Sequence, residues 1–357
     1  DMILAVVEQR AFDGLRSAGG IMAVNEAGAG AVQGIEIRFA EELTAPLLRL
    51  RMNLKDNGVL LEPVDRIHIF TRPERDDVRV FLSGSRSGAV YEATRADFTV
   101  KDVERFVGFG DSLPRYTRLS GSAGHYLPDE PLPMVRYRVE YSRFTADQLQ
   151  RSLFPDPLST RNLTEQGGSE IYTDGKRGLQ LRNDDLWMSY TDPAASSEGR
   201  QSALDSALSA VQFVNRHGGW NGDYVLERLR QDAGGAEWHA LFRQYVGGIT
   251  GAYPIVGMRS GGPFGPIELK LRGRVVIGYE RSTAQLEPEF VAREPVRLPG
   301  GERLLALWTA FAERGSAEAL YPAYVAVPDG GEMVLEPVWA VTMRDGAVRL
   351  LPGGGAY

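Results

Sequence analysis

Histidine side chains supply the commonest general base and metal ligand in proteins. This chain has four of them, His68, His125, His217 and His239, and no two are three or four residues apart. Helical zinc motifs such as His-Glu-x-x-His need that spacing, so the sequence contains none of them. We expect a structural role for His68, within a strand-like segment, and a local role for His217 at a helix end, where an imidazolium favours the helix dipole.

Serine nucleophiles and glycine-rich phosphate loops give no better match. The segment Gly84-Ser85-Arg86-Ser87-Gly88 resembles a Gly-x-Ser-x-Gly nucleophile elbow, but its central residue is an arginine. Gly28, Gly30 and Gly34 follow no clear strand, which indicates a loop rather than a dinucleotide-binding fingerprint. The chain has no cysteine, which excludes thiol nucleophiles, disulfides and cysteine-bound metals.

Carboxylates stand side by side at Glu41-Glu42, Asp76-Asp77 and Asp184-Asp185. Neighbouring residues in a strand point to opposite faces, so such pairs rarely form an acid–base dyad, and we interpret them as solvated turn residues. The sequence therefore predicts no catalytic residue, no cofactor-binding residue, no metal ligand and no cofactor.

Tryptophans could line a groove for a sugar or a peptide, but they more often anchor a hydrophobic core. We expect Trp220, which follows Gly218-Gly219 after an amphipathic helix, to close a core. The other tryptophans are Trp187, Trp238, Trp308 and Trp339.

The elements that would position these side chains begin with a helical stripe at about 2–16 and continue as strands. Alternating or β-branched runs at 35–39, 67–71, 78–82 and 89–94 predict an antiparallel meander. Two helix starts follow, each with a threonine N-cap and a capping-box partner three residues later, at Thr99–Asp102 and Thr145–Gln148.

The rest of the chain alternates between hairpins and helices. The strands and helices predicted there are a strand at 135–141, a hairpin at 171–181 turned by Asp174-Gly175, a strand at 186–191, a helix at 202–216, a hairpin at 267–279, a helix at 302–314, and strands at 321–327, 333–343 and 347–351. Strands and helices do not alternate regularly, which favours an α+β fold with mainly antiparallel sheets over a doubly wound parallel sheet.

Three domains fit the length of 357 residues. Three prolines between residues 128 and 133 cannot continue a helix or a central strand, so we place a boundary there. The glycine-rich segment at 232–235 marks a second boundary. The predicted domains are an N-terminal α+β domain at 1–130, truncated at its start, a central domain at 131–235 and a C-terminal domain at 236–357.

Charge and composition narrow the classes of partner. The net charge of −7 argues against a broad basic face for nucleic acid, and no apolar run approaches the roughly 20 residues of a membrane helix. The chain opens Asp1-Met2-Ile3 rather than with an initiator methionine, so we interpret it as a fragment.

Several motifs, taken in order, resemble the YycH family of two-component regulatory proteins. The densest matches lie between residues 126 and 222. The matching segments are 34–39, 90–93, 126–128, 153–157, 169–180, 210–215, 218–222 and 335–339.

The resemblance implies a protein outside the cytoplasmic membrane, held there by one N-terminal helix that this chain lacks. It implies a pairing with a relative, YycI, and regulation of the sensor histidine kinase WalK (also called YycG), which governs cell-wall metabolism. It also implies that the last two of three domains are related to YycI. If so, 135–235 and 236–351 should superimpose, matching the helix faces Leu204, Leu208 and Val211 with Leu304, Leu307 and Phe311.

The leading hypothesis is therefore a non-enzymatic extracytoplasmic regulator that acts through protein–protein contacts. The alternative is an extracytoplasmic binding module whose tryptophans and arginines hold a cell-wall fragment or a lipid. A third class, a hydrolase with a non-standard site, would need a deep pocket that pairs His125 or His239 with a carboxylate.

Overall fold

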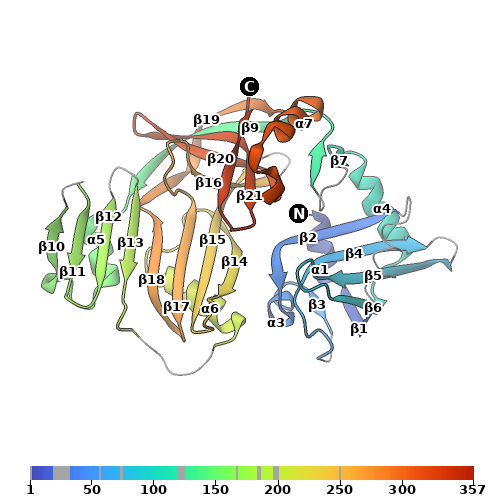
Figure 1. Ribbon diagram of the computed structural model, residues 1–357, viewed down its shortest axis with the longest axis horizontal. Helices are drawn as coiled ribbons and strands as arrows, with labels where there is room; N and C mark the ends of the chain where they lie inside the picture. Colours follow the sequence, from blue (N-terminus) through green and yellow to red (C-terminus); the bar gives the residue numbers. More distant parts are fainter. Residues whose placement is uncertain are drawn as a thin grey trace. The chain divides into compact units, whose positions relative to one another are not determined.

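The computed structural model describes residues 2–18, 33–55, 58–72, 75–119, 125–165, 168–182, 186–195, 201–248 and 251–357. The chain divides into two compact units, Asp1–Leu113 and Pro114–Tyr357, called unit 1 and unit 2 below (Figure 1). Strands outnumber helices in both units, and the α+β class expected from the sequence is confirmed at this level.

Unit 1 is built on a six-stranded sheet with the strand order β2-β4-β5-β6-β1-β3. The meander is confirmed, since β4, β5 and β6 pair antiparallel in sequence. Helix α4 begins with the predicted capping box, in which Thr99 and Asp102 exchange hydrogen bonds. The elements are α1 (Met2–Gln9), β1 (Ala11–Ser17), β2 (Gly34–Leu43), α3 (Ala45–Leu48), β3 (Asn53–Leu54), β4 (Val64–Arg72), β5 (Asp77–Ser83), β6 (Val90–Ala96) and α4 (Val100–Gly110).

The helix predicted at 2–16 is wrong beyond Gln9. Residues from Ala11 onward form β1, which pairs antiparallel with β6. Phe12 and Leu15 are buried, and their spacing of three residues fits a helix face as well as an irregular strand. The backbone of Gly14 excludes the helix, because its φ of +64° lies outside the helical region.

Unit 2 contains a 14-stranded sheet. Along its main path the order is β10-β11-β12-β13-β18-β17-β15-β16-β20-β21-β9-β19, with β14 beside β15 and β22 beside β21. The strands are β9 (Leu132–Arg143), β10 (Arg161–Thr164), β11 (Glu170–Thr173), β12 (Gly178–Arg182), β13 (Trp187–Thr191), β14 (Asp223–Gln231), β15 (Glu237–Gly248), β16 (Gly251–Met258), β17 (Pro266–Arg272), β18 (Val275–Ser282), β19 (Ala284–Leu298), β20 (Ala317–Asp329), β21 (Glu332–Met343) and β22 (Val348–Gly355), and the separate pair is β7 (Tyr116–Arg118) and β8 (Tyr126–Pro128).

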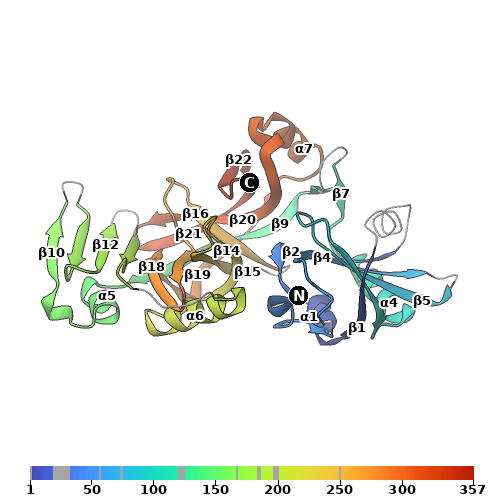
Figure 2. The ribbon, with the colours of Figure 1, turned by 60° about the horizontal axis from the view of Figure 1, so that its bottom comes forward.

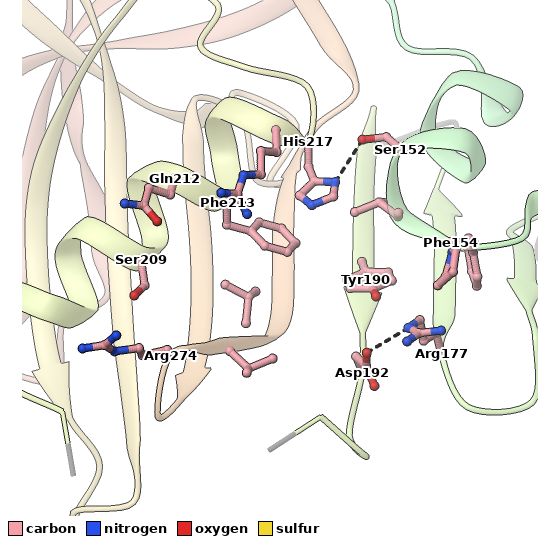
Figure 3. Close-up of a pocket in the computed structure, with 15 residues that line it drawn as sticks. Ser152, Phe154, Arg177, Tyr190, Asp192, Ser209, Gln212, Phe213, His217 and Arg274 are labelled. Carbon is pink, nitrogen blue, oxygen red and sulfur yellow. Dashed lines mark hydrogen bonds and ion pairs between the residues drawn. The ribbon is translucent and has the colours of Figure 1, made fainter. Parts of the chain in front are cut away.

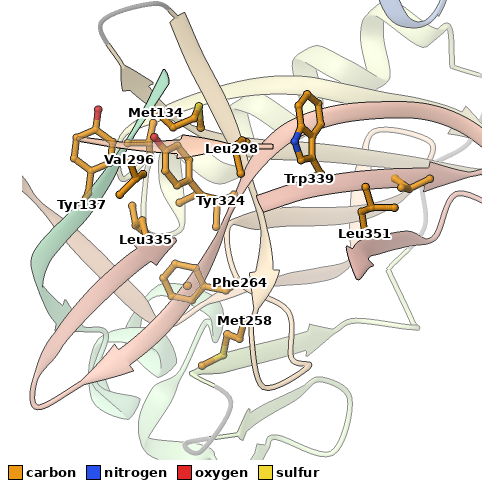
Figure 4. Close-up of a cluster of buried hydrophobic side chains, with 14 of the residues drawn as sticks. Met134, Tyr137, Met258, Phe264, Val296, Leu298, Tyr324, Leu335, Trp339 and Leu351 are labelled. Carbon is orange, nitrogen blue, oxygen red and sulfur yellow. The ribbon is translucent and has the colours of Figure 1, made fainter. Parts of the chain in front are cut away.

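Among the described residues, two large hydrophobic cores and a small cluster of Ala323, Val325, Val338 and Ala340 support this sheet. One lies under α5 (Ala146–Leu153) and α6 (Ala203–Arg216), which cover the same face of the sheet (Figure 2). The other includes Leu304 and Trp308 of α7 (Gly301–Ala310), and Figure 4 shows its buried side chains around Tyr324 and Phe264. The short 3-10 helices Pro157–Ser159 and Ala312–Ser316 follow α5 and α7.

The division into two units differs from the three domains predicted at 1–130, 131–235 and 236–357. The predicted boundary at 130/131 lies inside unit 2, and the one at 235/236 separates β14 from β15, which pair with each other. Strand β9, on one side of that boundary, also pairs with β19 and β21 on the other side. Residues 131–235 and 236–357 therefore share one sheet.

The prolines at 128–133 were expected to interrupt regular structure, yet Pro133 lies inside β9. Pro133 is paired with Arg297 of β19, whereas the described pairing of β9 with β21 covers only Tyr137–Glu140. Proline, which has no N–H, is tolerated where one side of a strand has no neighbour. Strand β9 can therefore include Pro133, because at that point it pairs with β19 and its described pairing with β21 lies further along the strand.

The predicted faces of the two later helices are partly confirmed. Of the face expected for α7, Leu304 and the C-cap residue Phe311 are buried, whereas Leu307 is half-buried. In α6 the expected Leu208 is 47% exposed, because the buried face is centred on smaller residues, Ala207, Ala210 and Val214. Helix α6 contacts β14, β15, β17 and β18, whereas α7 contacts β22 and β8, so the proposed correspondence between the two helices is not confirmed.

Candidate functional site

A pocket of about 500 Å³ opens between α5 and α6 in unit 2, over β13 and β18 (Figure 3). Its walls come from four places: the end of α5, one face of α6, the turn between β17 and β18, and the strand β13 with the turn before β12. The lining residues are Ser152, Leu153, Phe154, Pro155, Arg177, Tyr190, Asp192, Ser209, Gln212, Phe213, Arg216, His217, Arg274, Val275 and Val276.

Local sequence signals explain the two helices that border the pocket. Thr145 and Gln148 form the predicted capping box at the start of α5, and Ser202 accepts a hydrogen bond from the backbone N–H of Asp205 at the start of α6. Helix α6 ends in a Schellman-type turn, in which the N–H of Gly219 donates to the carbonyl of Val214 over 2.8 Å. These signals fix where α5 and α6 begin and where α6 ends.

A buried arginine holds the end of α6 against the sheet. Arg281 of β18 is 2% exposed and donates to the carbonyl of Gly219 (2.8 Å) and to the hydroxyl of Tyr279 (3.0 Å). Its guanidinium carbon lies 4.9 Å from the centre of the Phe144 ring. No ion pair of Arg281 occurs in the described part of the chain, and its position beside the negative end of the α6 dipole favours its positive charge.

His217 forms the upper wall of the pocket and is the C-cap of α6, so the predicted helix-end position is confirmed. Its Nδ1 lies 3.1 Å from Oγ of Ser152, and its ring packs against that of Phe213, tilted by 39° with centroids 4.2 Å apart. Burial lowers the pKa of His217, the hydrogen bond with Ser152 opposes this, and the charge of Arg216 lowers it further. The expected imidazolium is therefore disfavoured near neutral pH, and the ring is neutral.

An arginine–carboxylate cluster forms the opposite wall. Nε of Arg177 donates to Asp192 over 2.8 Å, and Nη1 of the same side chain donates to Asp174 over 3.0 Å. Burial raises the pKa of the neighbouring Tyr190 to about 12, with a further contribution from the charge of Asp192. Tyr190 is therefore a neutral phenol at physiological pH, and the charge of Arg177 is balanced inside the protein.

The remaining polar side chains of the pocket lie beside apolar ones. Phe213 and Val276 are apolar residues of the lining, while Ser209 and Gln212 project from α6 (Figure 3). Arg216, the last residue of α6, and Arg274, in the turn between β17 and β18, add two positive charges to the lining. The pocket thus combines hydroxyl and amide groups with charged side chains of both signs.

The pocket contains one serine–histidine pair. Ser152 and His217 are within hydrogen-bond distance, as a nucleophile and its base would be. A triad also needs a carboxylate that orients the imidazole, and none is bonded to His217 among the described contacts, since Asp192 pairs with Arg177 instead. Within the described ranges no group of three His, Asp or Glu side chains could hold a metal ion.

A second, smaller pocket of about 330 Å³ includes His239. Glu268 of β17 and Glu280 of β18 also line it and stand opposite each other in the sheet. Desolvation, and then the charge of Glu280, raises the pKa of Glu268. This is the arrangement named for the hydrolase hypothesis, but the described contacts of His239 include no hydrogen bond to either carboxylate.

The other two histidines are placed as structural residues. His68 lies in β4 opposite Glu36 of β2, and burial lowers its pKa. His125 packs on Trp308 with ring centroids 5.1 Å apart, away from both pockets. The structure therefore brings only His217 into the larger pocket and only His239 into the smaller one.

The segment at 84–88 is a hairpin turn between β5 and β6 rather than a nucleophile elbow. Arg86 pairs with Glu41 over 2.9 Å, and the backbone N–H groups of Arg86 and Ser87 donate to Glu42. Glu41 and Glu42 are half-buried in β2 rather than solvated in a turn as expected, and they fix the turn at 84–88. In the other described carboxylate pair, Asp77 binds Arg72 and Asp76 occupies the turn before β5. The third pair, Asp184-Asp185, lies outside the described residues, as do Gly28 and Gly30.

Tryptophans act mainly as core residues, as predicted. Trp187, Trp308 and Trp339 are buried, whereas Trp220 and Trp238 are half-buried at the edge of the α5–α6 core. Trp220 packs against Phe242 with ring centroids 5.0 Å apart and donates to Asn215 over 2.6 Å. None of these five side chains lines the pocket between α5 and α6.

The pocket's charged residues were missed by sequence reasoning. Arg177, Arg216 and Arg274 lie in a turn, at a helix end and in another turn, which are ordinary positions for arginine. The one sequence pattern that could have indicated a pocket residue is Arg216-His217-Gly218-Gly219, in which a basic helix end is followed by two glycines. Only the tertiary fold brings the three arginines around one cavity.

Comparisons with known proteins give one family match and one likeness of fold. The family described as "YycH protein, C-terminal domain" matches residues 123–351. The crystal structure of YycH from Bacillus subtilis is similar with a TM-score of 0.75 and 14% sequence identity, over 98% of this chain and 91% of that one. An uncharacterized protein from Eubacterium rectale reaches a TM-score of 0.38 at 10% identity, over 69% and 90% of the two chains. No curated protein sequence matches the chain.

Proposed function

The chain belongs to the YycH family of extracytoplasmic regulatory proteins, and on this basis we propose that it regulates a sensor histidine kinase through protein–protein contacts. The match of the family's C-terminal domain to residues 123–351 carries the proposal, because it covers nearly all of unit 2. The likeness to the B. subtilis protein extends the shared fold to both units.

The kinase in this proposal is WalK (YycG), which controls cell-wall metabolism, and the second partner is a YycI-like protein. The expected place of action is the outer face of the cytoplasmic membrane. Among the described residues no helix is long and apolar enough to cross a membrane. The proposal includes a structural relation between the later part of the chain, residues 131–357, and the YycI-like partner.

A regulator of this kind needs surfaces rather than a reactive centre, so we propose that the protein is not an enzyme. The incomplete Ser152–His217 pair supports this, because serine hydrolases orient their histidine with a third group. Turnover of peptidoglycan, peptides or esters by the purified protein, lost in Ser152→Ala, would contradict it.

Co-purification tests the partner contacts. The full-length protein, carrying an affinity tag, is expressed with the kinase and the YycI-like protein, and both should be retained on the resin. An unrelated sensor kinase from the same membrane serves as the control. Retention of neither partner, or equal retention of the unrelated kinase, would contradict the proposed function.

A further inference from the structure

We propose that the chain forms a twofold dimer in which strand β10 pairs with β10 of a second copy. This inference concerns self-association and does not depend on contacts with a kinase. It rests on the open edge of β10, the direction of its backbone N–H groups and the order of its side-chain charges.

Strand β10 lies at one end of the large sheet of unit 2, and among the described strands it pairs only with β11 (Figure 1). The strand at the other end of the main path, β19, contains two prolines and two register shifts, which discourage edge-to-edge pairing. Strand β10 has no proline, its register with β11 is regular, and its four residues are exposed. The outer edge of β10 can therefore accept another strand.

The pairing with β11 fixes which backbone groups of β10 face outward. The N–H of Glu165 donates to the carbonyl of Ser169 over 3.0 Å, so these two residues form a hydrogen-bonded pair of the antiparallel ladder. Hydrogen-bonded and non-hydrogen-bonded pairs alternate along such a ladder, so Asn162 and Thr164 direct their N–H and C=O groups away from β11. Twofold pairing centred on Leu163 brings Asn162 of each copy opposite Thr164 of the other, where the two residues exchange backbone hydrogen bonds.

The side chains of β10 are complementary to themselves in this register. Arg161, Leu163 and Glu165 lie on one face of the sheet, because residues two apart in a strand share a face. Twofold pairing centred on Leu163 places Arg161 of each copy opposite Glu165 of the other, and opposite charges that face each other across strands are stabilising. Pairing centred on Asn162 or on Thr164 places Leu163 opposite a charged residue instead, so the charges select the register centred on Leu163.

The same side chains are incompletely partnered within one copy. Arg161 forms no ion pair in the part of the chain that the structure describes, and Glu165 accepts a hydrogen bond from the neutral amide of Gln180 over 3.2 Å. Leu163 is 56% exposed. Its backbone groups face β11, so Leu163 meets its equivalent as a non-hydrogen-bonded pair, the kind in which side chains approach more closely. A second copy therefore supplies a carboxylate for Arg161 and covers Leu163.

Sedimentation equilibrium of the 357-residue chain measures the dimer. Because β10 is short, we expect weak association, detected between about 5 µM and about 500 µM protein as a rise in mass toward twice the monomer value. Arg161→Glu turns both attractive cross-strand pairs into repulsive ones and should weaken the dimer about tenfold or more. Arg297→Glu makes the same change of charge at an exposed position of β19 and should leave association unchanged.

A mixture of two variants tests the register. Glu165→Arg alone should weaken the dimer as Arg161→Glu does, because each variant places like charges opposite each other in its own dimer. When the two variants are mixed, opposite charges at residues 161 and 165 face each other at both ends of the paired strands, so association should return to that of the unchanged chain. Thermal melts check folding, and Arg161→Glu and Arg297→Glu should melt like the unchanged chain.

Hydrogen exchange locates the interface. The backbone amides of Asn162 and Thr164 should exchange more slowly as the protein concentration rises, because the dimer gives their N–H groups a partner, and Arg161→Glu should abolish this slowing. A monomer at every concentration, a dimer that Arg161→Glu leaves intact, or a mixture of variants that does not associate would each overturn the proposal. Binding of the YycI-like protein that Arg161→Glu abolishes, with an unchanged chain that stays monomeric, would assign the edge of β10 to that protein and refute the dimer.

Discussion

Replacing Gly218 with alanine tests the junction that ends α6 beside the pocket. Gly218 has a φ of +100°, and a Cβ built there lies 2.8 Å from Nη1 of Arg281 and 3.2 Å from Cζ of Phe144. The next residue, Gly219, has a φ of +65° and nothing within 4 Å of its would-be Cβ. The two positions therefore differ in crowding while both have left-handed backbone.

The expected magnitudes follow from this difference. Left-handed backbone costs an alanine about 1–2 kcal/mol, and this is the whole expected cost of Gly219→Ala. In Gly218→Ala the buried guanidinium of Arg281 must also move, and weakening its hydrogen bond to Gly219 adds about 1.5–3 kcal/mol. Gly218→Ala should therefore destabilise unit 2 by about 2.5–5 kcal/mol in total.

Tryptophan fluorescence during urea unfolding measures the effect on unit 2 alone, because all five tryptophans lie after residue 113. For a unit of this size each kcal/mol shifts the melting temperature by about 2–4 °C, so thermal melts give an independent reading. Equal destabilisation by the two variants would refute the argument from crowding. A Gly218→Ala protein as stable as the unchanged chain would refute the described packing of Arg281 as well.

Three further changes test other parts of unit 2. Trp220→Ala should reduce the free energy of unfolding by about 3 kcal/mol, as for a half-buried tryptophan, and lower the melting temperature accordingly. Partner binding should decrease only through misfolding. A variant that melts normally yet loses the partner would make Trp220 an interface residue. Thr145→Ala should cost about 1 kcal/mol in urea unfolding because α5 loses its capping box, whereas Thr145→Ser should keep most of it. Because the pKa of His217 is lower in the folded protein than in the unfolded chain, protonation of its ring favours unfolding. The contribution of His217 to the free energy of unfolding is fully present above the unfolded pKa of about 6.5 and falls as the pH decreases below it. The variant His217→Gln should flatten that part of the pH profile of stability.

Local signals in the sequence predicted much of the secondary structure. The alternation around Ile67 and Ile69 identified β4, the Asp174-Gly175 pair identified the hairpin of β11 and β12, and both threonine capping boxes are present. Each of these signals depends on residues close together in the chain. Such elements can be read from a single sequence because their determinants are local.

Strand β19 shows why the remainder was missed. Its 15 residues include Pro288 and Pro295 and are mostly polar or exposed, so no alternating pattern marks a strand. It is held by β9, through a register with bulges at Leu286–Phe290 and Phe290–Ala292. The structure of this segment is decided by a partner that local propensity cannot identify.

The candidate site was less predictable than the fold. His217 was placed at the end of a helix, but its partner Ser152 is 65 residues away in the chain. The sequence reading assigned no site residue, and the pocket residues become a group only after α5, α6 and the β17–β18 turn are packed together. The pocket residues are of common types, so only their proximity in the folded chain indicates a site.

The pairing of β9 with β19 and β21 has a consequence for the order in which the protein can fold. Arg136 meets Glu294 across 158 residues of chain, and Arg138 meets Glu332 across 194. Such distant pairings make folding slow, because closing a long loop of chain loses conformational entropy before the new contacts offset that loss. During synthesis β9 emerges long before its partners, and until the C-terminal strands arrive it presents open edges to other chains. A truncation before residue 284 would leave those edges exposed permanently.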